Sequence, residues 1–482
     1  MKTMKEKLFL ITITFFLSLC IANAQNNVTI KGKILNPVDS KVTFVLTKGE
    51  MDEAENITLD LDKNNSFVFT TQVSDLARFN FTHGKEISTN RWILEPNDEI
   101  TMTCDAKNFY PSLKFEGKNA EKFNYFVADY MEADIKRKWG EQVQKNESLP
   151  IDKQFAYLDT ILEVKLSTLE KYKNKINPMF YHVWKANLKG MVSNYRFNAI
   201  YSERRKNKDF SFYSLPAEQR KFVNDMPAQN DTTFKAFMYR NYLMNVLYSM
   251  VYPEIGLLSG NADWSAEKMK GLRKAFFKGK FLELVSAQEV KSTVGYEGIN
   301  KDSQKEYDEF FKEYPNSPYK AALEKTYEKM KLYAVGKPAI PFTLKNENGQ
   351  EVSLQDFKNK VVYLDFWASW CGPCIQEMKA SKPVKEHFKD NKDLVFLYIS
   401  IDDKAEDWKK GMEKHDVKGV NLWAEKAWED PVARAYNIQA IPKYYLIDGE
   451  GKFHDANPPR ASQNEGKDLI KALENALANT KK

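Results

Sequence analysis

Two cysteines three positions apart, Cys371 and Cys374, come directly after the apolar run at residues 361–364. The run predicts a buried strand, and thiols at this spacing fit on the first turn of a following helix. There they can close an easily reduced disulfide. The first thiol then lies among unpaired backbone N–H groups at the positive end of the helix dipole, which stabilises its thiolate. The pattern predicts a dithiol redox site built on a strand and a helix.

A Cys-x-x-Cys pair is also half of many zinc sites, and that alternative needs a second pair of ligands. The other cysteines are Cys20 and Cys104, and the five histidines show no paired spacing. Cys104 lies at an apolar position of the alternating run 100–104, which favours a buried thiol. We therefore predict redox chemistry at the pair, with no metal and no cofactor.

The amino terminus has the pattern of a secretory signal. Three lysines precede an apolar run at residues 8–21, and Ala22-Asn23-Ala24 fits a cleavage site. The run has about 14 residues, too few to span a bilayer comfortably. Lipidation at Cys20 is the alternative, but a small residue is expected before that cysteine and Leu19 is large. We predict that residues 1–24 are a cleaved signal peptide and that the protein resides in the periplasm or cell envelope.

Charged residues of both signs are interspersed along the chain. There are 72 basic and 66 acidic residues, with a formal net charge of +6. This mixture forms no basic surface of the kind that binds nucleic acid, so we predict no nucleic-acid partner. An exported protein that depended on disulfides for stability would carry more than four cysteines. The Cys371–Cys374 pair is therefore interpreted as a chemical site.

The 482 residues predict a multidomain chain. Residues 25–117 contain short runs of alternating apolar and polar residues separated by turn residues, which predict an all-β sandwich. Residues 118–334 show apolar residues at helical spacing and predict a helical domain without recognisable chemistry. A break at Val335-Gly336-Lys337-Pro338 follows. Residues 335–482 alternate strands with helices, which predicts an α/β domain with a mostly parallel sheet.

Four further marks accompany the cysteine pair, in order and at suitable separations. They are Gly336-x-Pro338, the Asn348-Gly349 hairpin, the Ile441-Pro442 pair and the run at residues 445–451, which stand around the Trp370-to-Cys374 motif Trp-Cys-Gly-Pro-Cys. On these marks, residues 336–482 resemble the exported thioredoxin-like thiol–disulfide proteins of bacterial envelopes, the TlpA or ResA type. The preceding residues more loosely resemble the β-sandwich and helical extension found before such domains in Gram-negative envelope proteins. The resemblance implies a thioredoxin-like fold for the last region.

The resemblance also implies roles for individual residues. Cys371 is expected to be the nucleophile and Cys374 the resolving thiol, the two closing a disulfide in the oxidised state. The bond between Ile441 and Pro442 is expected to be cis, so that a client strand pairs with the Ile441 backbone; an ordinary edge-strand proline is the alternative. The expected substrate-binding residues are Trp370, Gly372, Pro373, Ile441 and Pro442.

Two acidic residues are further catalytic candidates. In thioredoxins the acid at the place of Asp365 is buried, and burial raises its pKa so that it can take the Cys374 proton. The alternative is an exposed acid at a strand end. Glu377 shares a helical face with Cys374, and TlpA-type proteins often carry a glutamate there that influences the thiols; an acid complementing the first helical turn is the alternative. Lys379 stands where the family usually has a helix-kinking proline.

Gly372-Pro373 is the thioredoxin dipeptide, which favours a strongly reducing pair. We predict an exported reductase of disulfides in envelope proteins, recharged by a membrane electron donor. An oxidant or isomerase, and an envelope binding or assembly protein with an accessory redox domain, are the alternatives. A peroxidase is less favoured, because peroxiredoxin-like relatives place a threonine where this chain has Ala368. Three tryptophans near the site are predicted to serve packing: Trp408, Trp423 and Trp428.

Overall fold

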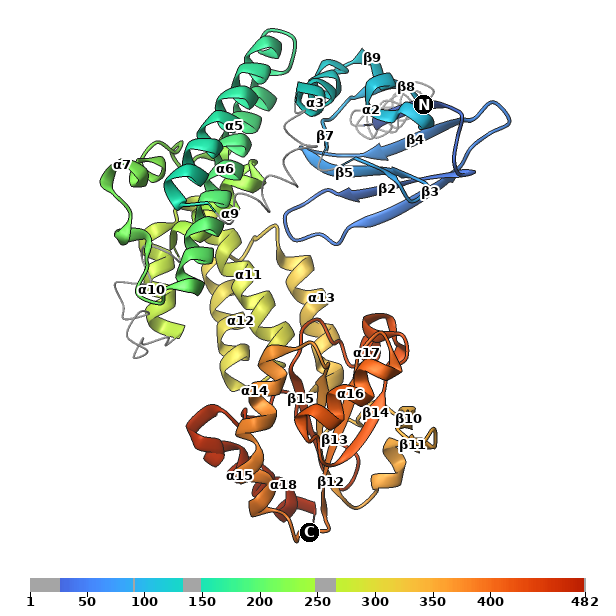
Figure 1. The fold of residues 1–482 in the computed structure, drawn as a ribbon, viewed down its shortest axis with the longest axis vertical. Coiled ribbons are helices and arrows are strands. Elements are labelled where there is room, and N and C mark those ends of the chain that lie inside the picture. The colour runs from blue at the N-terminus through green and yellow to red at the C-terminus, as the bar shows by residue number, and fades with distance from the viewer. Residues whose placement is uncertain (1–26, 90–91, 133–148, 248–265, 481–482) are drawn as a thin grey trace, which may run out of the picture. The chain divides into compact units, whose positions relative to one another are not determined.

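The computed structural model describes residues 27–89, 92–132, 149–247 and 266–480, so the predicted signal peptide and Cys20 lie outside the described residues. The chain divides into two compact units, Met1–Val285 and Ser286–Lys482 (Figure 1). The division falls within a single helix, α11 (Gly279–Glu297). The second unit thus begins well before the predicted start of the α/β domain at residue 335.

The first unit opens with two β-sheets, of strand order β4-β1-β8-β9 and β3-β2-β5-β6, with β7 paired to β5. Every second residue of β2, β5 and β8 is buried, as the alternating sequence predicts. Cys104 on β8 is a buried free thiol, which confirms that prediction, and burial raises its pKa to about 12. The strands are β1 (Asn27–Leu35), β2 (Lys41–Thr47), β3 (Glu55–Asp60), β4 (Ser66–Gln72), β5 (Ala77–His83), β6 (Ile87–Ser88), β7 (Trp92–Leu94), β8 (Glu99–Asp105) and β9 (Lys114–Lys118).

Helices follow the sheets in the first unit. One hydrophobic cluster joins sheet residues such as Phe79 to Phe123 of α3, Leu169 of α5 and Phe180 of α6. The predicted boundary between residues 117 and 118 therefore runs through a continuous core. The helices of this unit before α11 are α2 (Phe109–Ser112), α3 (Glu121–Glu132), α5 (Ile151–Tyr172), α6 (Pro178–Lys206), α7 (Ala217–Arg220), α8 (Asp231–Phe234), α9 (Phe237–Val246) and α10 (Ala266–Phe276).

The second unit is built on one sheet of order β11-β10-β14-β13-β12-β15-β16 (Figure 1). The prediction of a mostly parallel sheet is wrong. Within the described part of this sheet, only the pairings of β12 with β13 and of β13 with β14 are parallel, because β10–β11 and β15–β16 enter the sheet as antiparallel pairs. The strands are β10 (Thr343–Asn346), β11 (Glu351–Ser353), β12 (Val361–Trp367), β13 (Leu394–Ser400), β14 (Val420–Trp423), β15 (Lys443–Ile447) and β16 (Phe453–Asp455).

Helices cover this sheet. The apolar residues Leu469 and Leu473 of α18 pack in one cluster with Val361 of β12 and Leu446 of β15. The helix that begins after Cys371 ends at Ala380, and a second helix starts at Lys382 with Pro383 in its first turn. A break thus exists although Lys379 replaces the family proline, because Pro383 cannot continue the helix. The helices are α14 (Gly372–Ala380), α15 (Lys382–His387), α16 (Ala405–His415), α17 (Pro431–Ala435) and α18 (Lys467–Thr480).

Helices α12 (Lys301–Glu313) and α13 (Lys320–Met330) also belong to the second unit. Tyr333, at the end of the 3-10 turn after α13, donates its hydroxyl to the Ala435 carbonyl at 2.5 Å, and its ring lies 5.7 Å from that of Phe453. Lys329 donates to the Asn437 side chain at 2.6 Å. These helices are therefore packed on the α/β region. None of the described helices combines the length and apolar character needed to cross a bilayer.

Candidate active site

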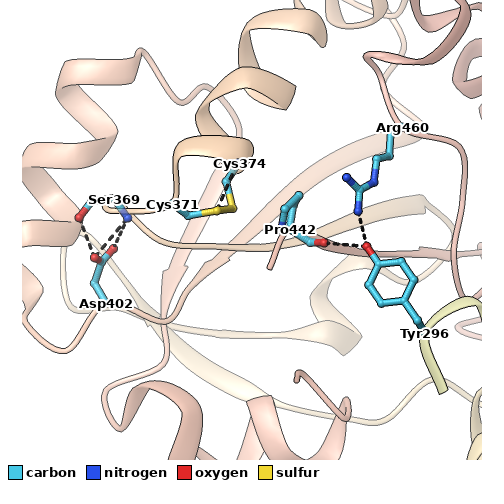
Figure 2. The surroundings of a disulfide bond; sticks show 7 residues. All are labelled: Tyr296, Ser369, Cys371, Cys374, Asp402, Pro442 and Arg460. Carbon is cyan, nitrogen blue, oxygen red and sulfur yellow. Dashed lines mark hydrogen bonds between the residues drawn. A yellow bond between two sulfur atoms is a disulfide. The ribbon is translucent and has the colours of Figure 1, made fainter. Parts of the chain in front are cut away.

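The cysteine pair lies at the start of α14, directly after β12, and the two sulfurs are bonded at 2.03 Å (Figure 2). Cys371 is the N-cap of the helix, and the Cys374 backbone N–H donates to the Cys371 sulfur at 3.1 Å. This N–H and the helix dipole favour negative charge on Cys371 when the bond is reduced. Cys371 is 4% exposed and Cys374 1%.

A buried carboxylate holds the turn before the cysteines. Asp402 accepts hydrogen bonds from the Ser369 N–H at 2.9 Å and the Ser369 hydroxyl at 2.7 Å (Figure 2). It also accepts from the Ser400 hydroxyl at 2.7 Å. Asp402 is not among the residues predicted from the sequence. Its position shortly after a buried parallel strand was the available signal, since the carboxyl ends of neighbouring parallel strands meet at one edge of a sheet.

Asp365 is buried inside β12, opposite Tyr398 of β13 and Tyr444 of β15. This excludes the alternative of an exposed acid at a strand end. Burial raises the pKa of Asp365 to about 8; Lys385 acts against the rise and Glu377 adds to it. Its Oδ1 atom has no hydrogen-bond partner among the described residues. The carboxyl group is therefore held neutral near pH 7 and can exchange a proton close to neutral pH.

Glu377 is also buried, and it accepts hydrogen bonds from both the hydroxyl and the N–H of Ser462, at 2.5 and 3.1 Å. It lies beyond the first turn of α14, so the alternative of a first-turn acid does not apply. Its charge acts on the buried Asp365. The two acids singled out from the sequence are thus electrostatically coupled.

The Ile441–Pro442 peptide bond is cis. Pro442 immediately precedes β15, which pairs on one side with β12 and on the other with β16. The alternative of an edge-strand proline is therefore wrong. Because β12 leads directly into the cysteine turn, this pairing ties the proline loop to the strand that carries the redox site.

Two tryptophans form an exposed pair near the disulfide. Trp370, adjacent to Cys371, is 58% exposed, and Trp428 is 37% exposed, with 6.4 Å between the ring centroids. The prediction that Trp428 serves packing is wrong. Trp428 lies in a short 3-10 turn that begins at Ala427, a left-handed residue with φ of 50°. The packing role is confirmed for Trp408 and Trp423, whose rings stack at 6.1 Å.

Comparison with known proteins agrees with this geometry. A family model described as the AhpC/TSA family matches residues 335–455. The thioredoxin-like protein YneN of Bacillus subtilis (strain 168) is 32% identical over 135 residues, 28% of this chain and 77% of that protein. The chain belongs to the thioredoxin-like family. Thiol-disulfide oxidoreductase ResA of Bacillus cereus (strain ATCC 10987 / NRS 248) is 29% identical over 126 residues, 26% of this chain and 70% of that protein.

A solved structure also matches this thioredoxin-like chain: the thioredoxin domain of a thiol-disulfide oxidoreductase from Bacteroides vulgatus. It is 33% identical and covers 30% of this chain and 96% of that one, with a TM-score of 0.27. The protein is a thioredoxin-like thiol-disulfide oxidoreductase, and the family model locates the match at residues 335–455. Each of these three relatives covers less than a third of the chain.

Proposed function

We propose that this oxidoreductase is exported and reduces disulfide bonds in proteins of the cell envelope. The observation that carries the proposal is the pair at the start of α14, with Gly372-Pro373 between the cysteines and an N–H donor on the Cys371 sulfur. Thioredoxin, which shares this dipeptide, has a potential of about −270 mV, against about −120 mV for the oxidant DsbA. A reducing role follows from this chemistry.

The reaction transfers two electrons from the dithiol to the client. The Cys371 thiolate attacks one sulfur of the client disulfide, and the other client sulfur leaves as a thiolate that takes up a proton. The Cys374 thiol then loses its proton and attacks the Cys371 sulfur of the mixed disulfide. The second client thiol leaves, and the Cys371–Cys374 disulfide remains, as in this structure.

In the fraction of molecules whose Asp365 carboxyl group is ionised, Asp365 is the proposed acceptor of the Cys374 proton. Its pKa of about 8 lies close to the value of about 8.5 for an ordinary thiol, so proton transfer between the two is nearly balanced. We assign Glu377 an indirect role, since its charge raises the pKa of Asp365.

The client surface is proposed to surround the exposed side of the pair. Gly372 and Pro373 are exposed, and a Cβ at Gly372 would meet no atom within 4 Å, which leaves room for a client backbone. Trp370 and Trp428 supply exposed aromatic area beside them. The Ile441 backbone, next to the cis bond, is the proposed pairing edge for a client strand.

The sequence supports the cellular setting. Residues 1–24 have the pattern of a signal peptide, which favours the periplasm or cell envelope over lipidation at Cys20. In such a compartment the pair needs a membrane electron donor to be reduced again. We propose that the all-β region at 25–117 and the helical region at 118–334 help select clients, with no nucleic acid, metal or cofactor involved. The family match begins at residue 335, and the helical residues 286–334 are proposed to fold together with the matched region, since both belong to the second unit.

Two alternatives concern the same disulfide. An oxidant or isomerase is distinguished by its potential: a value more positive than about −180 mV, that of a disulfide isomerase, contradicts the reductase assignment. A peroxidase is disfavoured because Ala368, where peroxiredoxin-like relatives have threonine, offers no hydroxyl. The assembly-protein alternative assigns the main function to residues 25–334.

A trapping experiment tests the reductase. In full-length Cys374→Ala, the mixed disulfide between Cys371 and a client cannot be resolved, so clients should accumulate as covalent adducts. The double variant Cys371→Ala/Cys374→Ala is the matched control and should trap nothing. Envelope proteins captured only by the single variant support the proposal. The absence of adducts in a strain that exports the variant contradicts it and favours the assembly-protein alternative.

A further inference from the structure

Helix α11 ends against the proline loop of the redox site. Tyr296, the residue before the last of this helix, lies with its hydroxyl 3.4 Å from the Pro442 carbonyl oxygen (Figure 2). Arg460 donates a hydrogen bond to the same hydroxyl. The Tyr296 hydroxyl can therefore donate to the Pro442 carbonyl while it accepts from Arg460.

A second contact lies next to Pro442 along the chain. Lys443, the following residue, donates its ammonium to the Tyr296 backbone carbonyl at 2.5 Å and to the Ala456 carbonyl at 2.8 Å. Lys443 is only 4% exposed, and its ammonium lies 5.1 Å from the centre of the Tyr296 ring. The carbonyls in the last turn of a helix lack helical partners and carry partial negative charge, so a buried ammonium satisfies and caps them.

The end of α11 fits closely at this place. Gly298 follows the helix with φ of 79°, a left-handed conformation typical of a helix end, and a Cβ there would lie 3.1 Å from the Cβ of Ala456. Burial lowers the pKa of Lys443 to about 8, while Asp455 and Glu297 oppose the change. The end of α11 thus lies close to Ala456, whose carbonyl also accepts a hydrogen bond from Lys443.

Tyr296, which contacts the proline loop, lies outside the part of the chain that the family model matches. That match begins at residue 335, whereas Tyr296 lies in the preceding helical segment. The contacts between Tyr296, Pro442, Lys443 and Arg460 all lie within the second unit, Ser286–Lys482. The segment therefore contributes a side chain and a helix end to the loop that carries the cis bond.

We propose that Tyr296 and Lys443 are positioning residues, which hold the Ile441–Pro442 loop in the geometry that pairs with a client strand. The inference rests on the proposed function in one respect, because it takes the Ile441 backbone as the client-pairing edge. Neither residue acts on the sulfur atoms. Their loss should therefore affect the binding of protein clients and leave the intrinsic chemistry of the disulfide unchanged.

Tyr296→Phe in the full-length protein is the decisive variant, because it removes one oxygen atom and keeps the ring beside Lys443. The expected result is a fall of about tenfold in kcat/KM for reduction of a folded protein disulfide such as insulin, the order expected for a lost polar anchor. Turnover of a small disulfide, hydroxyethyl disulfide, should stay within about twofold, because that substrate forms no strand pairing. The reduction potential should not change. A purely structural defect would lower both activities together.

Tyr327→Phe is the matched control. The Tyr327 hydroxyl donates to Gln304 within the preceding helical segment, so this variant should behave as the wild type on both substrates. Lys443→Met provides a second test, since it removes the donor to Tyr296 and Ala456. It should show the same split between protein and small substrates.

Amide hydrogen exchange separates this inference from the proposed function. In oxidised Tyr296→Phe, exchange in the peptide spanning residues 438–444 should be at least about tenfold faster than in the wild type, while the cysteine helix is unchanged. Unchanged exchange, or an equal loss of both activities, overturns the positioning role. If the wild type fails to reduce protein disulfides, the reductase function is overturned, and the exchange rates still decide whether Tyr296 anchors the loop.

Discussion

Different interactions hold the two sides of the redox site, which are the turn before the cysteines and the Ile441–Pro442 loop. On the cysteine side, the buried carboxylate of Asp402 accepts hydrogen bonds from Ser369 and Ser400, all within the family-matched region. On the proline side, the buried ammonium of Lys443 caps a helix that precedes that region. The contacts that hold the cysteine turn are thus internal to the thioredoxin-like region, whereas the proposed client loop also contacts the helix that precedes this region.

The difference separates chemistry from client recognition. A change on the cysteine side should affect every disulfide substrate, because all of them react at the same sulfur. A change on the proline side should discriminate between substrates, because only a protein client is proposed to pair with the loop.

Removal of helices α11 to α13 should have the largest effect. A chain of residues 336–482 loses Leu323, Met330 and Tyr333, each at most 2% exposed, and should be less stable than residues 286–482 by more than about 5 kcal/mol, since each buried apolar side chain contributes about 1.5 to 3 kcal/mol. Urea unfolding of the two chains measures this difference. Equal stability would show that the helices are dispensable and that residue 335 is the true boundary.

Replacement of the buried carboxylate should be the next largest effect. Asp402→Asn removes the carboxylate that accepts hydrogen bonds from Ser369 and Ser400 in the protein interior. Because the buried donors then lack this acceptor, the free energy of unfolding should fall by about 3 kcal/mol. Activity on insulin and on hydroxyethyl disulfide should fall by the same factor. Asp403→Asn, its exposed neighbour, is the control. A selective loss on insulin would contradict the division between the two sides.

The sequence predicts some elements of the fold and not others. The strand at 361–367 and the helix after Cys371 are predictable because a fully buried strand is a continuous apolar run and the Gly-Pro step marks the helix start. The short strand β14 is not predictable in this way, since four residues with one buried pair show no periodicity. Helix α12 is recognisable as an element, but periodicity does not say which sheet an amphipathic helix covers.

The sequence likewise predicts only some of the residues of the candidate site. Asp365 and Pro442 are recognisable because the resemblance to thioredoxin-like proteins assigns a buried acid and a cis-proline to these places around the cysteines. Tyr296 and Lys443 make their contact across 147 positions of sequence, and Trp428 meets Trp370 through a loop conformation. Neither contact leaves a local pattern, so only the structure reveals them.

The pH dependence of stability tests the environment of Asp365. Burial raises its pKa in the folded state to about 8, whereas an unfolded aspartate has a pKa of about 4. Between these values the folded state retains a proton that the unfolded state has lost, so this group makes the free energy of unfolding fall as pH rises from about 4 to about 8. The stability that the group contributes is therefore greatest at acidic pH.

Asp365→Asn removes this titration. The free energy of unfolding of this variant, relative to that of the wild type, should be about 5 kcal/mol higher at pH 8 than at pH 4, because the pKa differs by about 4 units between the two states and one unit corresponds to about 1.4 kcal/mol. The cost of burying the amide is the same at both pH values and cancels from this comparison. Thermal unfolding at both pH values measures the difference. The control is Asp356→Asn, which changes an exposed acid of the same unit. A constant difference across pH would mean that Asp365 is ionised in the folded protein.

Trp428→Ala should produce the smallest change and sharpen the comparison most. Trp428 is 37% exposed and contacts the exposed Trp370, so its loss should leave stability within about 0.5 kcal/mol, as for most surface substitutions. If the aromatic pair binds clients, KM for insulin should rise about threefold to tenfold, because an aromatic contact is worth about 0.5 to 1.5 kcal/mol. Hydroxyethyl disulfide turnover should be unchanged. Leu332→Ala, a 60% exposed side chain on the same unit, is the control. An equal effect on both substrates would mean that Trp428 acts through Trp370 on the cysteine turn, and therefore on the reaction of every disulfide.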